Sequence, residues 1–320
     1  MSSALVCASH SPLMYCWARE PECHAVVEQL FVTRAAQIRA WVPQLVIIFG
    51  PDHFNGFFLR LMPPFCAGTR CVAAADIGGF PGALDVPEAE ALDCIAAARL
   101  ADVDLAASYA MTVDHGFSQA LHRLLGGLDT YPTIPIFING IAPPFVPFRR
   151  SRLLGAAVGR YAATLGKRVL FIASGGMSHN PTRYYPDIGT GTASVMDWQI
   201  HGELATSMTS ADWLYRLDAM HREGAAMLAQ GTRTRADLKL NPEIDGQFLQ
   251  IVTSPQLDRV DALDPTLLVA QAGIGILELH TWIAAAAAHQ AAGGPPPIID
   301  HYTEALEYGI AFGMAHSQPP

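Results

Sequence analysis

The chain has 320 residues and a mass of 34.4 kDa, which is long enough for one large α/β domain or two ordinary domains. Hydrophobic residues make up 51% of the chain and charged residues only 15%, a balance that excludes a disordered protein and a coiled coil. Because 20 Lys and Arg stand against 29 Asp and Glu, the formal net charge is −9, and we expect no general affinity for nucleic acid.

The sequence lacks the marks of a membrane or secreted protein. No apolar run reaches the ~20 residues that a membrane span needs. No Lys or Arg precedes Arg19, so the basic start of a signal peptide is missing. All six cysteines lie in the first third without CxxC pairs, which favours reduced thiols over a zinc knuckle or a disulfide framework. We therefore expect a cytoplasmic protein that does not contact a membrane.

Short apolar runs alternate with longer amphipathic stretches in the first half of the chain. The runs are rich in β-branched residues and predict buried strands over residues 4–9, 44–50, 104–111, 133–140 and 168–176. The stretches between them predict helices over residues 25–41, 87–100, 116–126 and 151–165. This alternation predicts an α/β fold of layered type, with a mainly parallel central sheet flanked by helices.

The second half is less regular. Residues 181–190 predict a loop, and residues 195–235 predict polar helix. A new element begins in residues 241–248, and an Ala-rich helix over residues 274–291 ends before GGPPP, a strong breaker. The aromatic residues of the tail, 298–314, are expected to dock on the core. Since no linker is visible, we predict one domain over residues 1–320 with a helical, lid-like insertion at about 185–240.

Four of the five predicted strands run into a segment that carries a histidine. These are His10, His53, His115 and His179. Ligands of open α/β sheets bind at the carboxyl ends of the strands, so four imidazoles could converge in one crevice. The plainer interpretation, that each histidine only makes one hydrogen bond in its loop, weakens when it must hold for all four.

Three histidines, or two histidines and a carboxylate, form the usual open site of a catalytic metal. Glu278 is a candidate carboxylate because it lies in an otherwise apolar stretch, although an exposed helix position would explain it equally well. Such a donor set leaves about three positions on octahedral Fe(II), enough for a bidentate substrate and O₂. The other two histidines would then be free for acid–base work.

The motifs around these residues resemble the class III extradiol ring-cleavage dioxygenases, the superfamily of the protocatechuate 4,5-dioxygenase β subunit. The matching segments are SHSP (9–12), PDHFNGFF (51–58), MPPFC (62–66), VDHGF (113–117), LLGGLD (124–129), IFING (136–140), SGGMSH (174–179), LNP (240–242) and TWIAA (281–285). The resemblance covers most of residues 4–180 and about 240–315, and it is thin across 182–235.

The resemblance implies a role for each of the five residues. His10, His53 and Glu278 correspond to the ligands of an Fe(II) ion. His179 corresponds to the base that takes a proton from a catechol hydroxyl, and His115 to the acid that assists O–O cleavage. A chain with these residues is expected to be a single catalytic domain and a homo-oligomer, with a small catechol and O₂ as its substrates.

Further residues are candidates for binding the substrate. Asn55 and Phe57 would shape the aromatic slot, or would only form an Asn-Gly turn. Asp114 would orient His115 beside the substrate, or would cap the loop. A carboxylate on the substrate needs a cation to bind it, and the candidates are Arg149, Arg150, Arg152 and Arg183. A plainer interpretation of the first three is that they lie exposed at the start of a helix.

The expected reaction is Fe(II)-dependent extradiol cleavage of a 3-substituted catechol in aromatic catabolism. The expected substrate is 3-(2,3-dihydroxyphenyl)propionate, with 2,3-dihydroxycinnamate as a second, and the product is a 2-hydroxy-6-oxo-diene dioate. Three alternatives stay open: the same chemistry on a different catechol, a non-catalytic binding protein on the same fold, and a zinc hydrolase.

Overall fold

The computed structural model describes residues 2–181 and 190–317. Its main feature is an eight-stranded sheet with the order β10-β11-β1-β9-β2-β8-β3-β6, and a small sheet with the order β5-β4-β7 lies beside it. The strands are β1 (Ser2–Ala8), β2 (Leu45–Gly50), β3 (Phe65–Gly68), β4 (Cys71–Ala73), β5 (Gly82–Ala83), β6 (Ala106–Ser108), β7 (Met111–Val113), β8 (Thr133–Ile138), β9 (Arg168–Ser174), β10 (Ile298–Ala305) and β11 (Ile310–Ser317).

The centre of the large sheet is parallel, as predicted. β1 pairs with β9, β9 with β2, and β2 with β8, all in parallel, with Ala8 opposite Ser174 and Phe49 opposite Ala173. β2, β8 and nearly all of β1 and β9 are buried, which explains their continuous apolar sequences. The sheet becomes antiparallel on both sides, where β11 joins β1 and β3 joins β8.

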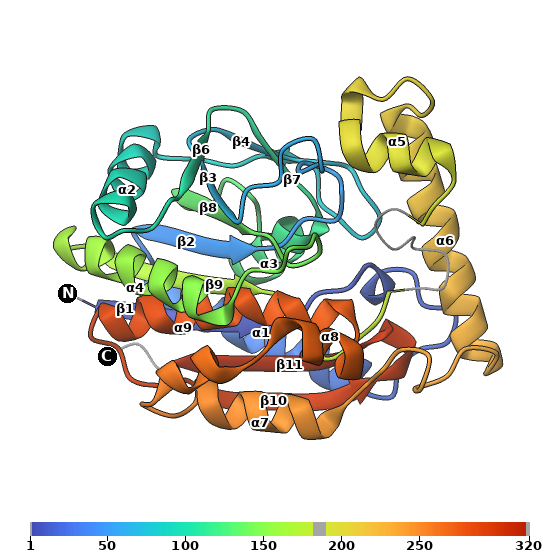
Figure 1. Ribbon diagram of the computed structural model, residues 1–320. Coiled ribbons are helices and arrows are strands. Elements are labelled where there is room, and N and C mark those ends of the chain that lie inside the picture. Colours follow the sequence, from blue (N-terminus) through green and yellow to red (C-terminus); the bar gives the residue numbers. More distant parts are fainter. Residues whose placement is uncertain (1, 182–189, 318–320) are drawn as a thin grey trace.

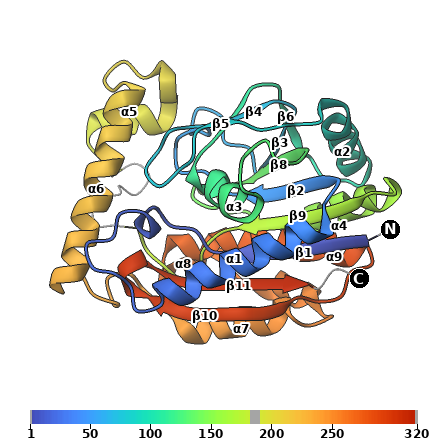
Figure 2. The same ribbon diagram turned by 180° about the vertical axis from the view of Figure 1, so that it is seen from behind.

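Helices cover both faces of this sheet. They are α1 (His24–Trp41), α2 (Glu88–Leu100), α3 (His115–Leu125), α4 (Phe148–Thr164), α5 (Ala193–His201), α6 (Ser210–Gln230), α7 (Pro242–Val252), α8 (Pro265–Ala272) and α9 (Leu279–Ala291), with short 3₁₀ turns that include η4 (Ile274–Glu278). α4 and α9 lie together on the face toward the viewer in Figure 1. α1 and α3 lie on the opposite face, seen in Figure 2. Within the described ranges, no helix is both long and apolar enough to cross a bilayer.

Three sequence predictions need correction. Residues 104–111 form two strands instead of one, because the chain bends at Tyr109 and Ala110, and β6 and β7 belong to different sheets. The tail does dock on the core, but as the antiparallel hairpin of β10 and β11. The predicted helix 274–291 begins with the 3₁₀ turn η4, and α9 itself begins at Leu279.

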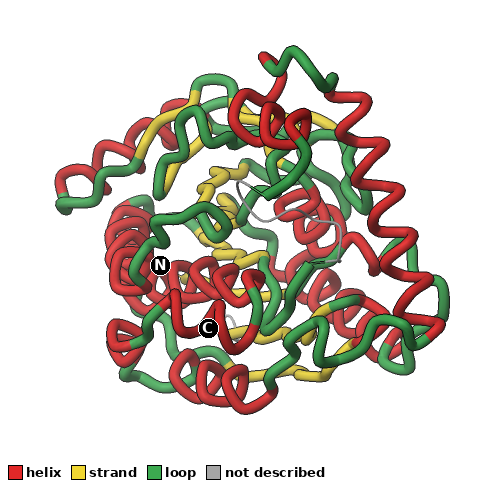
Figure 3. Tube along the Cα trace, turned by 45° about the vertical axis from the view of Figure 1, so that its right-hand side comes forward, coloured by secondary structure: helices red, strands yellow, loops and turns green. Residues whose placement is uncertain are grey.

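The stretch predicted as polar helix contains α5 and α6. α6 stands at the end of the molecule toward which the arrow of β2 points (Figure 1), and the tube in Figure 3 shows it as a long helix at the periphery. Trp213 of α6 donates its indole hydrogen to Oδ1 of Asn55, which ties the helix to the loop after β2. That this segment acts as a lid stays a prediction. The predicted loop 181–190 lies mostly outside the described residues.

Candidate active site

Three of the predicted histidines follow strands of the parallel core. His10 lies two residues after β1, His53 three residues after β2, and His179 five residues after β9. These strands are neighbours and run in one direction, so their carboxyl ends bring the three side chains to one edge of the sheet. His115 arrives by another route: it is the first residue of α3, after the small-sheet strand β7, and Asp114 caps that helix.

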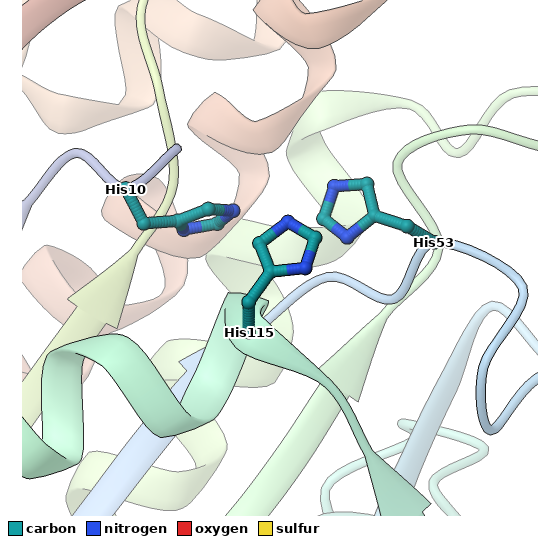
Figure 4. A group of neighbouring side chains, drawn as sticks. All are labelled: His10, His53 and His115. Carbon is teal, nitrogen blue, oxygen red and sulfur yellow. The ribbon is translucent and has the colours of Figure 1, made fainter. Parts of the chain in front are cut away.

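The imidazole rings converge as the strand-end argument predicts. Figure 4 shows His10, His53 and His115 pointing toward one another from a loop, a second loop and the start of a helix. The ring centroid of His10 lies 5.7 Å from that of His53 and 5.4 Å from that of His115. The rings of His53 and His115 stack at 4.4 Å with an interplanar angle of 18°.

Glu278, the last residue of the 3₁₀ turn η4, completes the cluster. Its Oε1 lies 3.3 Å from Nε2 of His53 and 3.8 Å from Nε2 of His179, and its Oε2 lies 3.7 Å from Nε2 of His10. The backbone N–H of Gly176 donates to Oε2 and holds the carboxylate in place. The side chain is buried, so the interpretation of Glu278 as an exposed helix residue is wrong.

The second ring nitrogen of each histidine has its own partner, which fixes the orientation of the ring. These partners are Oγ of Ser174 for His10 at 2.9 Å, Oδ2 of Asp114 for His53 at 3.0 Å, the carboxylate of Asp76 for His115, and the carbonyl oxygen of Met177 for His179 at 2.9 Å. Asp114 therefore orients His53, whereas the sequence analysis offered it as a partner of His115. Asp76 takes that place, and no spacing in the sequence connects it with His115.

Burial and neighbouring charges set the protonation of the cluster. Burial lowers the pKa of His10 to about 3, so its imidazole is neutral near pH 7. Burial also works to lower the pKa of His53, but the carboxylates of Asp114 and Glu278 outweigh it and hold this pKa well above its ordinary value. For Glu278, burial works to raise the pKa, yet the neighbouring histidines prevail and the pKa is lowered. The glutamate is thus an ionised carboxylate.

This donor set fits a divalent cation. Nε2 of His10 is buried and has no hydrogen-bond partner among the described residues. Nδ1 of His53 donates to Asp114, so its Nε2 and the Glu278 oxygen would face each other as two acceptors unless a proton or a cation lay between them. Neutral imidazoles and a carboxylate are ligands that iron and zinc accept.

A second grouping of donors is also present. Ring nitrogens of His10, His53 and His115 lie within 4.8 Å of one another. We favour Glu278 over His115 as the third donor, because Glu278 contacts both His10 and His53 and supplies negative charge, while His115 is bound to its own carboxylate, Asp76.

The cluster forms the floor of a cavity of about 470 Å³, a size that suits a small aromatic molecule. All five predicted residues line it. Its walls are mostly apolar and come from distant parts of the chain, and they include Phe54, Ile141, Phe145, Leu217, Val269 and Ile274. Leu217 belongs to α6, so the helical insertion forms part of the wall.

The residues proposed to shape the substrate site lie elsewhere, since Asn55, Phe57 and Asp114 do not line this cavity. Phe57 stacks on Phe137 at 3.7 Å in the core. Asn55 donates to Oδ2 of Asp114 at 3.0 Å and accepts from Trp213, so it supports the loop that carries His53. Asp114 is fully buried behind His53. The geometry thus gives no support for direct contact between these residues and a substrate.

The arginines proposed to bind a carboxylate are also away from the cavity wall. Arg152 forms a two-pronged ion pair with Asp261, with distances of 2.8 and 2.5 Å, and Arg149 approaches the same carboxylate at 3.9 Å. Arg150 lies in the first turn of α4 and does not line the cavity. Arg183 lies outside the described residues.

Two basic residues of the cavity wall were missed by the sequence analysis. His221 of α6 donates from Nδ1 to the carbonyl of Leu217 at 2.7 Å, and burial lowers its pKa to about 4. Lys239 lies in the turn before α7 and also lines the cavity. No motif marks either residue, because both lie in stretches where only the fold decides which side chains reach the site.

Comparison with known proteins agrees with this site. The model of the family described as "Catalytic LigB subunit of aromatic ring-opening dioxygenase" matches residues 4–308. A relative from Paraburkholderia xenovorans (strain LB400), named 2,3-dihydroxyphenylpropionate/2,3-dihydroxicinnamic acid 1,2-dioxygenase, is 41% identical over 319 residues, which cover 100% of this chain and 98% of the relative.

Two further relatives carry the same name. The protein from Mycolicibacterium gilvum (strain PYR-GCK) is 44% identical over 282 residues, covering 88% of this chain and 87% of its own. The protein from Escherichia coli O139:H28 (strain E24377A / ETEC) is 40% identical over 285 residues, covering 89% of this chain and 88% of its own. The chain therefore belongs to the family of catalytic LigB subunits of aromatic ring-opening dioxygenases and is an extradiol catechol dioxygenase.

Proposed function

We propose that the protein cleaves 3-(2,3-dihydroxyphenyl)propionate, and also 2,3-dihydroxycinnamate, with Fe(II) and O₂, giving a 2-hydroxy-6-oxo-diene dioate. The observation that carries this proposal is the convergence of four imidazoles and Glu278 on the floor of one cavity. The names of the relatives, which are similar over nearly the whole chain, support the choice of substrate. We further propose a single catalytic domain, a cytoplasmic location and a homo-oligomeric assembly.

We propose that His10, His53 and Glu278 hold the metal ion. Their atoms Nε2, Nε2 and Oε face one another, and the neutral His10 and the ionised Glu278 are both in the form that binds a cation. Iron bound there supplies Lewis acidity toward the two catechol oxygens and a path for electrons to O₂. Ser174 and Asp114 orient the two rings from behind.

We assign His179 as the base that accepts a proton from a catechol hydroxyl. Its Nδ1 lies 2.9 Å from the carbonyl oxygen of Met177, which can only accept, so the ring hydrogen resides on Nδ1. In the neutral form of this ring, Nε2 carries the lone pair, and it lies 3.8 Å from Oε1 of Glu278 in the lining of the cavity. A neutral imidazole with its acceptor nitrogen at the substrate position is suited to take a proton near pH 7.

We assign His115 as the acid that delivers a proton when the O–O bond breaks. Its Nδ1 is bound to the carboxylate of Asp76, and the same carboxylate accepts from the backbone N–H of His115 at 3.2 Å. A second proton on Nε2 gives an imidazolium paired with a buried carboxylate, which is the proton-donating form. The different partners of His115 and His179 thus suit them to opposite roles.

The walls of the cavity protect the reaction from water. Apolar side chains surround the histidine cluster on several sides, and they come from the loops after β2 and β8, from α6 and α8, and from the tail. A planar aromatic ring between them would displace water from the acid and the base and so favour direct proton transfer between the substrate and these histidines.

The experiment that tests this function is a panel of catechols with the purified, Fe(II)-loaded protein. O₂ uptake and product spectra are recorded for 3-(2,3-dihydroxyphenyl)propionate, 2,3-dihydroxycinnamate, catechol and protocatechuate. We expect the first two to give the highest kcat/KM and a yellow product. A preference for an unsubstituted catechol, or for protocatechuate, would overturn the substrate assignment while leaving the reaction class intact.

A further inference from the structure

The cavity lining includes a lysine that lies outside the recognised sequence motifs. Lys239 follows Leu238, and both residues line the cavity beside His179 and Asn180. The backbone N–H of Asn180 donates to the carbonyl of Leu238 at 2.8 Å, which ties the lysine's turn to the segment that carries His179. Among the described residues that line the cavity, Lys239 is the sole lysine or arginine.

The backbone of Lys239 has an unusual conformation. Its φ is 52°, in the left-handed region that glycine and asparagine occupy at lower cost than other residues. Three other described non-glycine residues have a positive φ, and one of them, Phe54, also lines the cavity. Strained backbone conformations occur more often at ligand sites than elsewhere, and both Lys239 and Phe54 combine a positive φ with a place in the cavity lining.

The side chain of Lys239 is exposed, and its ammonium group is only weakly bound within the protein. Nζ lies 3.4 Å from the carbonyl oxygen of Ala270, a long hydrogen bond to a neutral acceptor in the last turn of α8. Over the described ranges, no carboxylate forms an ion pair with Lys239. Among the described residues that line the cavity, Glu278 is the one acidic residue, and it is engaged by three histidines. Within that part of the lining, a carboxylate on the substrate would not compete with an acid for this lysine.

We propose that Lys239 determines specificity by binding the side-chain carboxylate of the substrate through its ammonium group. This inference rests on the proposed function, because it presumes a catechol with an anionic side chain. An aromatic ring on the histidine cluster directs a short side chain along the wall, and a charge-assisted hydrogen bond to Nζ would complete its recognition. Lys239 takes the role that the sequence analysis gave to an arginine, and the described arginines of that group already bind Asp261 or lie off the cavity.

The test uses a pair of substrates that differ only in charge. The variant Lys239→Met keeps the length of the side chain and removes the ammonium group. With 3-(2,3-dihydroxyphenyl)propionate we expect KM to rise about 10- to 100-fold, the range of a charged hydrogen bond. With 3-propylcatechol, which lacks the carboxylate, we expect kcat/KM to stay within about twofold, since the lost contact was never made. Lys239→Arg should restore most of the affinity for the acid.

The chain offers a matched control, because Lys167 is its other lysine. Lys167 pairs with Glu90 and does not line the cavity, so Lys167→Met should leave both substrates unchanged. Equal losses on both substrates in Lys239→Met, or no loss on either, would overturn the proposal.

A binding measurement on the unmodified protein separates this proposal from the proposed function. The two lysines are acetylated slowly, and the extent at each is read by mass spectrometry with and without 3-phenylpropionate, which has no diol and cannot be cleaved. We expect protection of Lys239 but not of Lys167, and none from 3-phenylpropan-1-ol. Absent protection by the acid would refute the role of Lys239, whereas protection in a protein that cleaves no catechol would refute only the proposed reaction.

Discussion

The four imidazoles of the site differ in the groups behind them. His115 rests on a carboxylate, Asp76, and His179 rests on a backbone carbonyl, that of Met177. A carboxylate stabilises a protonated ring by charge, while a carbonyl only fixes the position of one hydrogen. The assignment of acid and base therefore depends on these partners as much as on the histidines, and it can be tested at both.

The acid and the base should be dispensable for iron binding. His115→Gln and His179→Gln are expected to retain iron yet lose ring cleavage by roughly 10²-fold or more, the typical contribution of general acid–base catalysis. Iron content by elemental analysis, measured together with kcat, checks both parts. An iron-loaded His179→Gln protein with normal turnover would remove this residue from the mechanism.

The proposed ligands should behave in the opposite way. In His53→Ala we expect loss of iron after gel filtration, since one of two imidazole donors is gone, but a normal circular dichroism spectrum, since His53 lies beyond the end of β2. His201→Ala serves as the control, because this histidine is exposed on α5, where it pairs with Asp197, and does not line the cavity. Full iron occupancy in His53→Ala would contradict the ligand set.

Asp76 gives a sharper test of the acid. We expect Asp76→Asn to lower kcat and to shift the pH profile of kcat, because an amide cannot pair with an imidazolium as a carboxylate does. A purely structural role would lower thermal stability without moving the pH profile. An unchanged profile would therefore separate Asp76 from the proton transfer.

The positions of these residues could be predicted from the sequence to different degrees. His10, His53 and His179 follow apolar runs that only a parallel sheet explains, so their convergence follows from the rule that strand ends meet. Asp76 and Lys239 have no such marker. Both residues lie in segments outside the helices and strands. The path of such segments depends on how other elements pack, and it cannot be predicted from a single sequence.

Helix α9 directly follows Glu278 and is buried from Leu279 to His289. It packs on α4 with almost no space between the backbones. A Cβ at Gly155 would stand 2.0 Å from the carbonyl oxygen of Ala284, and one at Gly159 would stand 2.1 Å from that of Ala288. The Ala-rich sequence of this helix thus provides the surface that lets the two helices approach closely.

This contact predicts a large effect for a small substitution. Gly159→Ala should lower the free energy of unfolding by about 1–3 kcal/mol, because the new methyl group overlaps backbone that must move. Iron retention should also fall, since α9 holds Glu278. Gly246→Ala in α7 is the matched control: nothing lies within 4 Å of its Cβ, so we expect stabilisation by roughly 0.5–1 kcal/mol. Denaturant titration of both variants checks the pair, and similar effects would contradict the packing argument.

Buried histidines on α9 predict a loss of stability in acid. Burial lowers the pKa of His280 to about 3 and that of His289 to about 4. The unfolded chain, with its ordinary histidine pKa near 6.5, binds protons that the folded protein excludes. The contribution of these two histidines to the free energy of unfolding is therefore complete above about pH 6.5, and it is lost as the pH falls toward their pKa values in the folded protein.

The variant His289→Gln isolates one of these groups. Between pH 6.5 and 4.5, its free energy of unfolding should fall less steeply with pH than that of the parent protein. The difference in slope should correspond to the uptake of up to about one proton fewer on unfolding. Chemical denaturation of the metal-free proteins at several pH values measures this difference. Identical slopes would mean that His289 does not titrate on unfolding.

The elements themselves were predictable where the pattern was long. The four parallel strands have continuous apolar sequences, and the helices between them begin within three residues of their predicted starts. The short strands β3, β4 and β5 escaped prediction, because two to four residues carry no period. β10 also escaped, since it is half exposed and its pairing partner, β11, defines it.

The whole molecule combines a parallel core with antiparallel edges, and the site lies at the single edge where the carboxyl ends of β1, β2 and β9 meet. Segments from both halves of the chain close over it, including α6 and the turn that carries Lys239. Because the net charge is −9, the molecule as a whole does not attract an anionic substrate, and recognition depends on local groups.

The fate of the two oxygen atoms tests the central claim most directly. Fe(II)-loaded protein is incubated with 3-(2,3-dihydroxyphenyl)propionate under ¹⁸O₂, and the product is analysed by mass spectrometry and absorbance. We predict incorporation of oxygen from O₂ and a cut beside the diol, between the carbon that bears the side chain and its hydroxylated neighbour, which gives a yellow, conjugated hydroxy-keto-dienoate. A colourless muconate, from a cut between the two hydroxyls, or a product without ¹⁸O would contradict the account.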